Sequence, residues 1–289
     1  MRRAVWTLGL VLLVASGAPA QAPPVFKAEV DLVRVDVAVT RGGVPVADLR
    51  PRDFEIREDG RLQNVDGLLE ERDLPLDVSL VLDASTSVRG ERLLALREGA
   101  LAFVDGLRPA DRAAVICFSE QVSLRAAAGE PVERIRRAIE TVEGNGSTAL
   151  RDALWSALAL REVPSATRGV VVAFSDGVDN MSWLSEAQLL DTARRTDSVV
   201  YGVIAAPARG QAGTNERFLD ALASATGGRT WRLTEGRPLR SVFVEVLAHI
   251  RSRYVLSYVP GVDRPGWHAL EVRLRGPRAS VLARPGYQR

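Results

Sequence analysis

The stretch LVLDASTS, residues 80–87, joins an apolar segment to one carboxylate and three hydroxyls. The apolar residues predict the end of a β-strand, yet no glycine or proline in the stretch marks a simple turn. In sheets built from alternating strands and helices, ligands bind at the carboxyl ends of the strands, where the loops begin. The oxygen-bearing side chains of residues 83–87 therefore predict a binding site at a strand's carboxyl end.

Outward from this stretch, apolar strands alternate with amphipathic helices between residues 76 and 253. We expect strands at residues 77–82, 113–118, 121–125, 169–174, 198–204 and 229–233. We expect helices at residues 90–107, 131–142, 149–161, 215–226 and 239–250, and one that begins with a capping box at residues 185–188. Residues 169–174 are unbroken apolar sequence, which is typical of a strand covered on both faces. The alternation predicts an α/β fold with a doubly wound, mostly parallel sheet.

The two flanks of this region alternate apolar and polar residues, which predicts antiparallel strands. The clearest examples are residues 30–39, 53–57, 254–259 and 269–274. Neither flank carries enough strands to be stable alone. We therefore expect the N-terminal segment 21–75 and the C-terminal segment 254–289 to pack together as a small antiparallel β-sandwich beside the α/β domain of residues 76–253.

Residues 1–20 predict a secretory signal peptide. Arg2 and Arg3 precede the apolar run 8–14, and the small residues 18–20 supply a cleavage site near Ala20. The run is shorter than the ~20 residues that span a bilayer, so an uncleaved anchor is the less favoured alternative. We expect a secreted or periplasmic protein with no membrane span after cleavage.

Charge and cysteine content argue against two further classes of function. Without Arg2 and Arg3, the 38 basic residues fall to 36, which equals the number of acidic residues. A neutral mature chain without a clustered basic face does not predict nucleic-acid binding. Cys117 is the only cysteine, so no internal disulfide is expected, and we interpret it as a buried strand residue.

Oxygen-bearing side chains gather at three places on the predicted sheet edge. Asp83, Ser85 and Ser87 follow the first long strand, Thr148 precedes a helix, and Asp176 follows a later strand. Two carboxylates and three hydroxyls, without sulfur or imidazole, suit a hard cation, Mg²⁺ first and Mn²⁺ or Ca²⁺ as alternatives. We call these five residues the cation-site residues. We leave outside the site three nearby residues interpreted as turn or loop-supporting residues: Asp152, Asp179 and Asn180.

The pattern Asp-x-Ser-x-Ser, followed by a later Thr and a later Asp, resembles the metal-ion-dependent adhesion site (MIDAS) of von Willebrand factor type A (VWA) domains. The resemblance covers roughly residues 76–253. It implies that Ser85, Ser87 and Thr148 bind Mg²⁺ through their hydroxyls, with Asp83 and Asp176 in direct or water-mediated contact. It also implies an adhesion-type module in which an Asp or Glu carboxylate of a partner protein completes the coordination.

The flanks resemble those of VWA-related proteins common in Acidobacteria. The motifs that carry this second resemblance are residues 35–39, 43–49, 53–56, 58–60, 253–258 and 284–287. The family has no well-defined activity, so this resemblance implies nothing about the partner.

Three alternatives to the binding function compete on the same residues. Ser87 could instead cap the following helix. A Mg²⁺-dependent hydrolase with an aspartate nucleophile would resemble Asp-x-Asp and use a lysine, but Ser85 holds the third position and the only lysine is Lys27. The chain also lacks the His-Glu-x-x-His and Gly-x-Ser-x-Gly motifs, so we expect no catalytic residues and no enzyme activity. The third alternative is a structural envelope module whose metal only stabilises loops.

Overall fold

The structure is a computed structural model that describes residues 32–70, 74–159, 167–176, 179–205, 214–234, 236–261, 264–276 and 278–289. The predicted signal peptide lies outside these residues. Within the described ranges, no helix has both the length and the apolar character needed to cross a bilayer.

A six-stranded sheet forms the centre of the α/β region, with the strand order β11-β10-β9-β6-β7-β8. Its strands are β6 (Leu76–Asp83), β7 (Arg112–Phe118), β8 (Val122–Ala126), β9 (Arg168–Ser175), β10 (Val199–Ile204) and β11 (Thr230–Arg232). All neighbouring pairs are parallel except β8, which runs antiparallel to β7 at the edge. The mostly parallel sheet predicted from the alternation is therefore confirmed.

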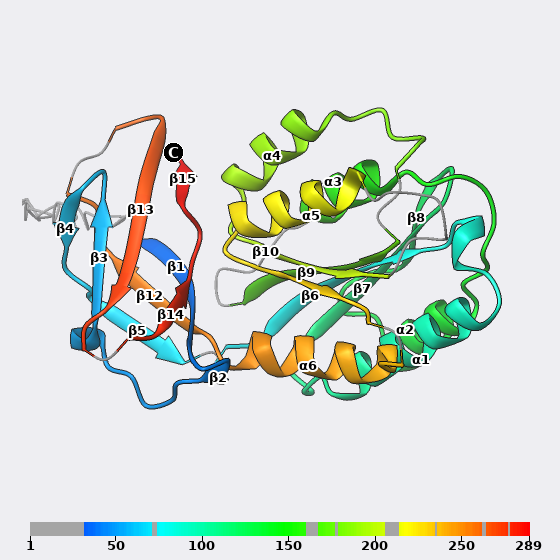
Figure 1. Ribbon diagram of the computed structural model, residues 1–289, viewed down its shortest axis with the longest axis horizontal. Helices are drawn as coiled ribbons and strands as arrows, with labels where there is room; N and C mark the ends of the chain where they lie inside the picture. The colour runs from blue at the N-terminus through cyan, green and yellow to red at the C-terminus, as the bar shows by residue number, and fades with distance from the viewer. Residues whose placement is uncertain are drawn as a thin grey trace, which may run out of the picture. The chain divides into compact units, whose positions relative to one another are not determined.

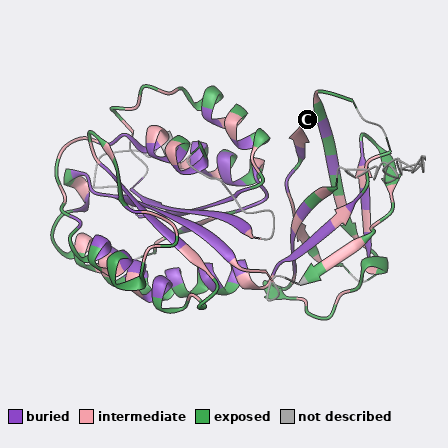
Figure 2. Cartoon of the chain, turned by 180° about the vertical axis from the view of Figure 1, so that it is seen from behind, coloured by how far each residue is buried: buried purple, intermediate pink, exposed green. Residues whose placement is uncertain are grey.

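Helices cover both faces of this sheet (Figure 1). One face packs against α1 (Glu91–Asp105), α2 (Val132–Glu140) and α6 (Leu239–Arg251). The other packs against α3 (Leu150–Ala159), α4 (Glu186–Arg195) and α5 (Thr214–Ala225). Side chains alternate between the two apolar cores along β6, where Leu80 and Leu82 enter the first and Val81 the second. Every residue of β6 and β9 is buried, as Figure 2 shows for the central strands.

Two helix starts test predictions about capping. The capping box at the start of α4 is present, because Ser185 accepts from the Gln188 N–H and the Gln188 side chain accepts from the Ser185 N–H. Helix α1 follows Gly90, whose φ of 65° requires glycine, and no side chain caps it. Ser87 lies instead in the short 3₁₀ helix Thr86–Val88, so the capping alternative for Ser87 is wrong.

The flanking segments form two further antiparallel sheets, each of which contains strands from both ends of the chain. One has the order β14-β1-β12-β5, with β2 paired to β1, and the other has the order β15-β13-β3-β4. The strands are β1 (Val33–Arg41), β2 (Val44–Pro45), β3 (Phe54–Glu58), β4 (Arg61–Gln63), β5 (Gly67–Glu70), β12 (Tyr254–Tyr258), β13 (Trp267–Leu274), β14 (Ser280–Leu282) and β15 (Gly286–Gln288). The 3₁₀ helix Pro51–Asp53 precedes β3. Both sheets contribute to one apolar core that includes Val35, Ile56, Leu256 and Leu270.

A buried ion pair joins the flanking strands to the α/β region. Asp36 on β1 accepts from Arg168 at the start of β9, at 2.7 Å from Nε, and from Arg253, which directly precedes β12. Arg253 also donates to the Gly227 carbonyl at 2.7 Å. Burial by itself raises the pKa of Asp36, but the two guanidinium groups outweigh it and hold that pKa below its usual range.

Candidate cation site

Asp83 ends β6 with both carboxylate oxygens engaged. Oδ1 accepts the Ser85 backbone N–H at 2.9 Å, and Oδ2 accepts the Ser175 hydroxyl at 2.8 Å. The first bond holds the turn that follows the strand, and the second ties β6 to the end of β9. Ser175 was not predicted as a site residue, although its place directly before Asp176 was visible in the sequence.

The turn after Asp83 brings two of the predicted hydroxyls together. Ser85 Oγ and Ser87 Oγ lie 2.8 Å apart, Ser85 is buried, and Thr86 between them is exposed. Ser85 is the extended residue before the 3₁₀ helix Thr86–Val88, and Ser87 lies within that helix. Two hydroxyl oxygens at this separation can bind one cation together.

A second loop carries Thr148 and is fastened to the first. The Asn145 N–H donates to the Ala84 carbonyl at 2.8 Å, and the Thr86 N–H donates to the Gly146 carbonyl at 3.0 Å. Gly146 has a φ of 73°, a conformation that favours glycine. Thr148 is buried, with 4% of its surface exposed. Two backbone hydrogen bonds therefore join the loop that follows β6 to the loop that precedes α3.

Asp176 directly follows β9 and is fully buried. Because β9 pairs parallel with β6, with Leu82 opposite Phe174, the ends of the two strands lie at the same level of the sheet. Burial raises the pKa of Asp83 to about 6, against the effect of hydrogen bonds from Ser85 and Ser175, and repulsion from Asp176 adds to the rise. Two buried carboxylates that repel each other favour a bound positive charge between or beside them.

The oxygen atoms of the cation-site residues fit a hard divalent cation, provided that the hydroxyls bind it together with the carboxylates. Among the described residues, no three His, Cys, Asp or Glu side chains gather closely enough to hold a metal. Asp83 and Asp176 would therefore need the hydroxyls of Ser85, Ser87 and Thr148 to complete a shell of oxygens, which is the kind of ligand that Mg²⁺ prefers.

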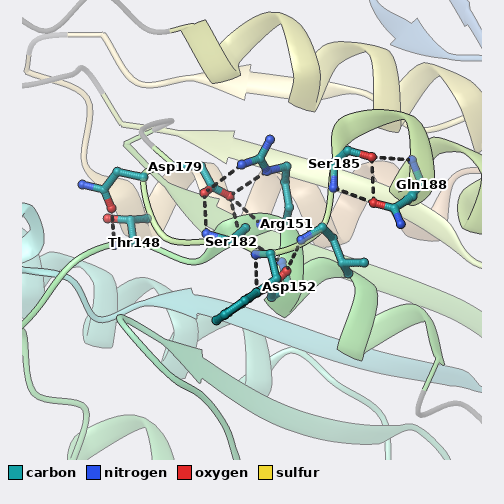
Figure 3. A network of polar contacts seen from close by, with 10 residues as sticks. Thr148, Arg151, Asp152, Asp179, Ser182, Ser185 and Gln188 are labelled. Atoms are coloured by element: carbon teal, nitrogen blue, oxygen red, sulfur yellow. Dashed lines mark hydrogen bonds and ion pairs between the residues drawn. The ribbon is translucent and has the colours of Figure 1, made fainter.

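A polar network supports the loop on the other side of Thr148 (Figure 3). The fully buried carboxylate of Asp179 accepts from Arg151, at 2.8 Å from the backbone N and 3.2 Å from Nε, and from the Ser182 hydroxyl at 2.7 Å. Asp152 accepts the backbone N–H groups of residues 183 and 184, both at 3.0 Å. The interpretation of Asp152 as a loop-supporting residue is confirmed.

A polar cavity of about 340 Å³ lies beside the two fastened loops. Ala84 and Asn145 from these loops form part of its wall, and Ser123 and Arg125 of β8 form another part. Arg125 donates to the Thr141 hydroxyl at 3.3 Å. The cavity offers hydrogen-bonding groups of both kinds to a polar side chain next to the candidate site.

Comparisons with known proteins agree with the fold of the α/β region. Residues 78–178, which include all five cation-site residues, match the family model of the von Willebrand factor type A domain. The chain is 24% identical over 174 residues to human inter-alpha-trypsin inhibitor heavy chain H4. That match covers 56% of this chain but only 18% of the human protein.

Three solved structures show the same fold at low sequence identity. A von Willebrand factor type A protein from Catenulispora acidiphila has a TM-score of 0.55 at 11% identity, covering 90% of this chain and 75% of that chain. Proximal thread matrix protein 1 from the mussel byssus, solved with a zinc-occupied MIDAS motif, has a TM-score of 0.54 at 18% identity, covering 65% and 48%. The corresponding domain of the type V pili tip protein Mfa5 from Porphyromonas gingivalis has a TM-score of 0.51 at 11% identity, covering 62% and 95%.

Proposed function

We propose that the VWA domain of this chain, supported by the family match over residues 78–178, is a non-enzymatic, adhesion-type protein-binding module that holds Mg²⁺ at its MIDAS. The observation that carries the proposal is the convergence at the end of β6. There Asp83 is fixed through both oxygens, and the hydroxyls of Ser85 and Ser87 stand 2.8 Å apart. Mn²⁺ or Ca²⁺ are alternative ions for the same oxygens.

In this proposal Ser85, Ser87 and Thr148 bind the cation through neutral hydroxyls, and Asp83 and Asp176 lie close to it. The bound cation supplies a positive charge that neutral ligands do not cancel, and Mg²⁺ keeps exchangeable water positions. An Asp or Glu carboxylate of a partner protein would take one of those positions. The zinc-occupied MIDAS of the mussel protein supports a divalent ion in this fold.

We also propose that the protein is exported, as its predicted signal peptide indicates. The fold is shared with a pilus tip protein, which supports a surface role. The two antiparallel sheets of the flanks, which share one apolar core, would then form a β-sandwich module that carries the VWA domain.

One competing function has an observation in its favour. Because burial raises the pKa of Asp83, a cation would stabilise the fold even without any partner, so the metal could be purely structural. A hydrolase is less favoured, because both oxygens of Asp83 already accept hydrogen bonds and neither is presented as a nucleophile.

Metal-dependent capture separates these functions. Immobilised wild-type protein, Ser85→Ala and the matched control Ser280→Ala, an exposed serine on β14, are incubated with cell-envelope extract in Mg²⁺ or EDTA. We expect the wild type and Ser280→Ala to retain the same proteins in Mg²⁺ only, and Ser85→Ala to retain none of them. Identical capture by all samples would make the metal structural. Phosphatase or peptidase turnover that Asp83→Ala abolishes would instead show an enzyme.

A further inference from the structure

The loop of residues 179–184, which precedes α4, exposes two large apolar side chains beside the candidate site. Trp183 is 95% exposed and Met181 is 46% exposed. An indole almost wholly in water is unusual in a folded domain, where aromatic side chains usually bury most of their surface. Exposed aromatic side chains on a fixed backbone are typical of binding surfaces.

Each backbone N–H from residue 180 to residue 185 donates a hydrogen bond, and Figure 3 shows the network around Asp152, Asp179 and Gln188 that accepts several of them. The N–H groups of residues 180 and 181 both donate to the Thr148 carbonyl at 3.1 Å. The next N–H donates to Asp179 at 3.1 Å, and those of residues 183 and 184 donate to Asp152 at 3.0 Å. The Ser185 N–H donates to Gln188 Oε1 at 2.9 Å. The loop is thus ordered before any partner binds, and little backbone entropy is lost on binding.

The same loop is continuous with the cation site. The Asn180 side chain accepts the Thr148 N–H at 2.9 Å. Thr148 is therefore bonded to the loop both through its N–H and through its carbonyl. Asp152, which holds Trp183, lies in the first turn of α3, four residues after Thr148. Met181 and Trp183 therefore belong to the loop whose backbone is hydrogen-bonded to Thr148 and to the start of α3.

We propose that Met181 and Trp183 form an apolar anchor at the rim of the cation site, and that the partner is a protein segment carrying an acidic residue next to apolar side chains. This inference rests on the proposed function, because the acidic residue is the group that binds the cation. Acidic side chains occur on nearly every protein surface, so a carboxylate alone selects poorly among partners. A rigid indole that must fit an apolar neighbour supplies the missing discrimination.

A peptide screen tests the anchor directly. Full-length protein in Mg²⁺ is used to select from a bead-displayed library of peptides with a fixed central Asp and random flanking residues. We expect the wild type to enrich Leu, Phe, Trp or Met beside the Asp. For the best peptide, Trp183→Ala should weaken binding roughly 10-fold or more, whereas Trp183→Phe should retain most of it. The control Leu62→Ala, which truncates a 54% exposed side chain on β4, should change nothing.

Each remaining outcome has one meaning. If Trp183→Ala binds the same peptides equally well while Ser85→Ala and EDTA abolish binding, the anchor is refuted and the cation site stands. If no peptide binds in a way that depends on Mg²⁺ and Ser85, the proposed function fails and the anchor fails with it. If sedimentation shows a wild-type dimer that Trp183→Ala converts to monomers, the indole binds a second copy of the chain and the proposed partner is wrong. The melting temperature of Trp183→Ala should match the wild type, because the side chain is exposed.

Discussion

Replacing Asp83 with asparagine should stabilise the cation-free protein at neutral pH and abolish its response to Mg²⁺. The asparagine keeps a side-chain oxygen to accept the Ser85 N–H, and its amide can donate to the Ser175 hydroxyl. It removes the buried negative charge that the fold tolerates poorly without a counter-ion. The variant should therefore be more stable than the wild type without a cation, yet gain no stability when Mg²⁺ is added.

The magnitude follows from the pKa of Asp83, which burial raises from 3.8 to about 6 in the folded state. A difference of about two pKa units corresponds to about 3 kcal/mol of free energy of unfolding. Because the folded-state pKa lies above the unfolded one, the protonated form of Asp83 favours the folded state. This stabilisation is fully present below pH 3.8 and is lost as the pH rises through about 6. At pH 7 the charged Asp83 therefore destabilises the cation-free fold by about 3 kcal/mol, and asparagine removes that penalty.

Urea denaturation followed by circular dichroism measures both effects, in EDTA and in saturating Mg²⁺, between pH 4 and pH 7. In EDTA we expect Asp83→Asn to exceed the wild type in stability at pH 7, with the difference shrinking towards pH 4. In Mg²⁺ only the wild type should gain stability. The control Asp48→Asn, at an exposed aspartate, should behave as the wild type. A variant that is less stable than the wild type in EDTA at pH 7, or that still responds to Mg²⁺, would refute the reasoning.

Three further variants or reagents test other parts of the structure. Asp36→Ala removes the carboxylate that bonds to both Arg168 and Arg253, and it should lower the free energy of unfolding by about 3–5 kcal/mol. Glu271→Ala in an exposed pair should change it by less than about 1 kcal/mol. Gly146 has a φ of 73°, and an alanine there would bring its Cβ to 2.8 Å from the Glu120 side chain. Gly146→Ala should therefore lower the melting temperature and weaken Mn²⁺ binding. Burial raises the pKa of the Cys117 thiol to about 12, so iodoacetamide should label it only after unfolding.

Hydrophobic pattern was enough to predict the central sheet and most helix positions. Strands covered on both faces are rich in apolar residues, so the unbroken apolar run in β9 and the largely apolar β6 could be recognised without any tertiary information. The capping box at Ser185 is equally local, since its bonds join residues only three positions apart. The carboxyl ends of parallel strands meet at one edge, which is why Asp83 and Asp176 could be grouped before the structure was known.

Contacts between distant segments could not be predicted in the same way. Alternation within a strand indicates which side chains share a face but not which strand lies alongside, so the position of β1 between β12 and β14 required the structure. The buried pair of Asp36 with Arg253 runs against the general rule that charged residues are exposed. Ser175 has a role only because β9 ends beside Asp83, and a serine at a strand end has no distinctive pattern of its own.

Direct titration with Mn²⁺, followed by electron paramagnetic resonance, tests the central claim that one divalent cation binds at the cation-site residues. We predict one Mn²⁺ per wild-type chain and per Ser280→Ala chain, displaced by Mg²⁺, and greatly weakened binding in Ser85→Ala and Thr148→Val. Equal Mn²⁺ binding by all four proteins, or no binding by the wild type, would contradict the account.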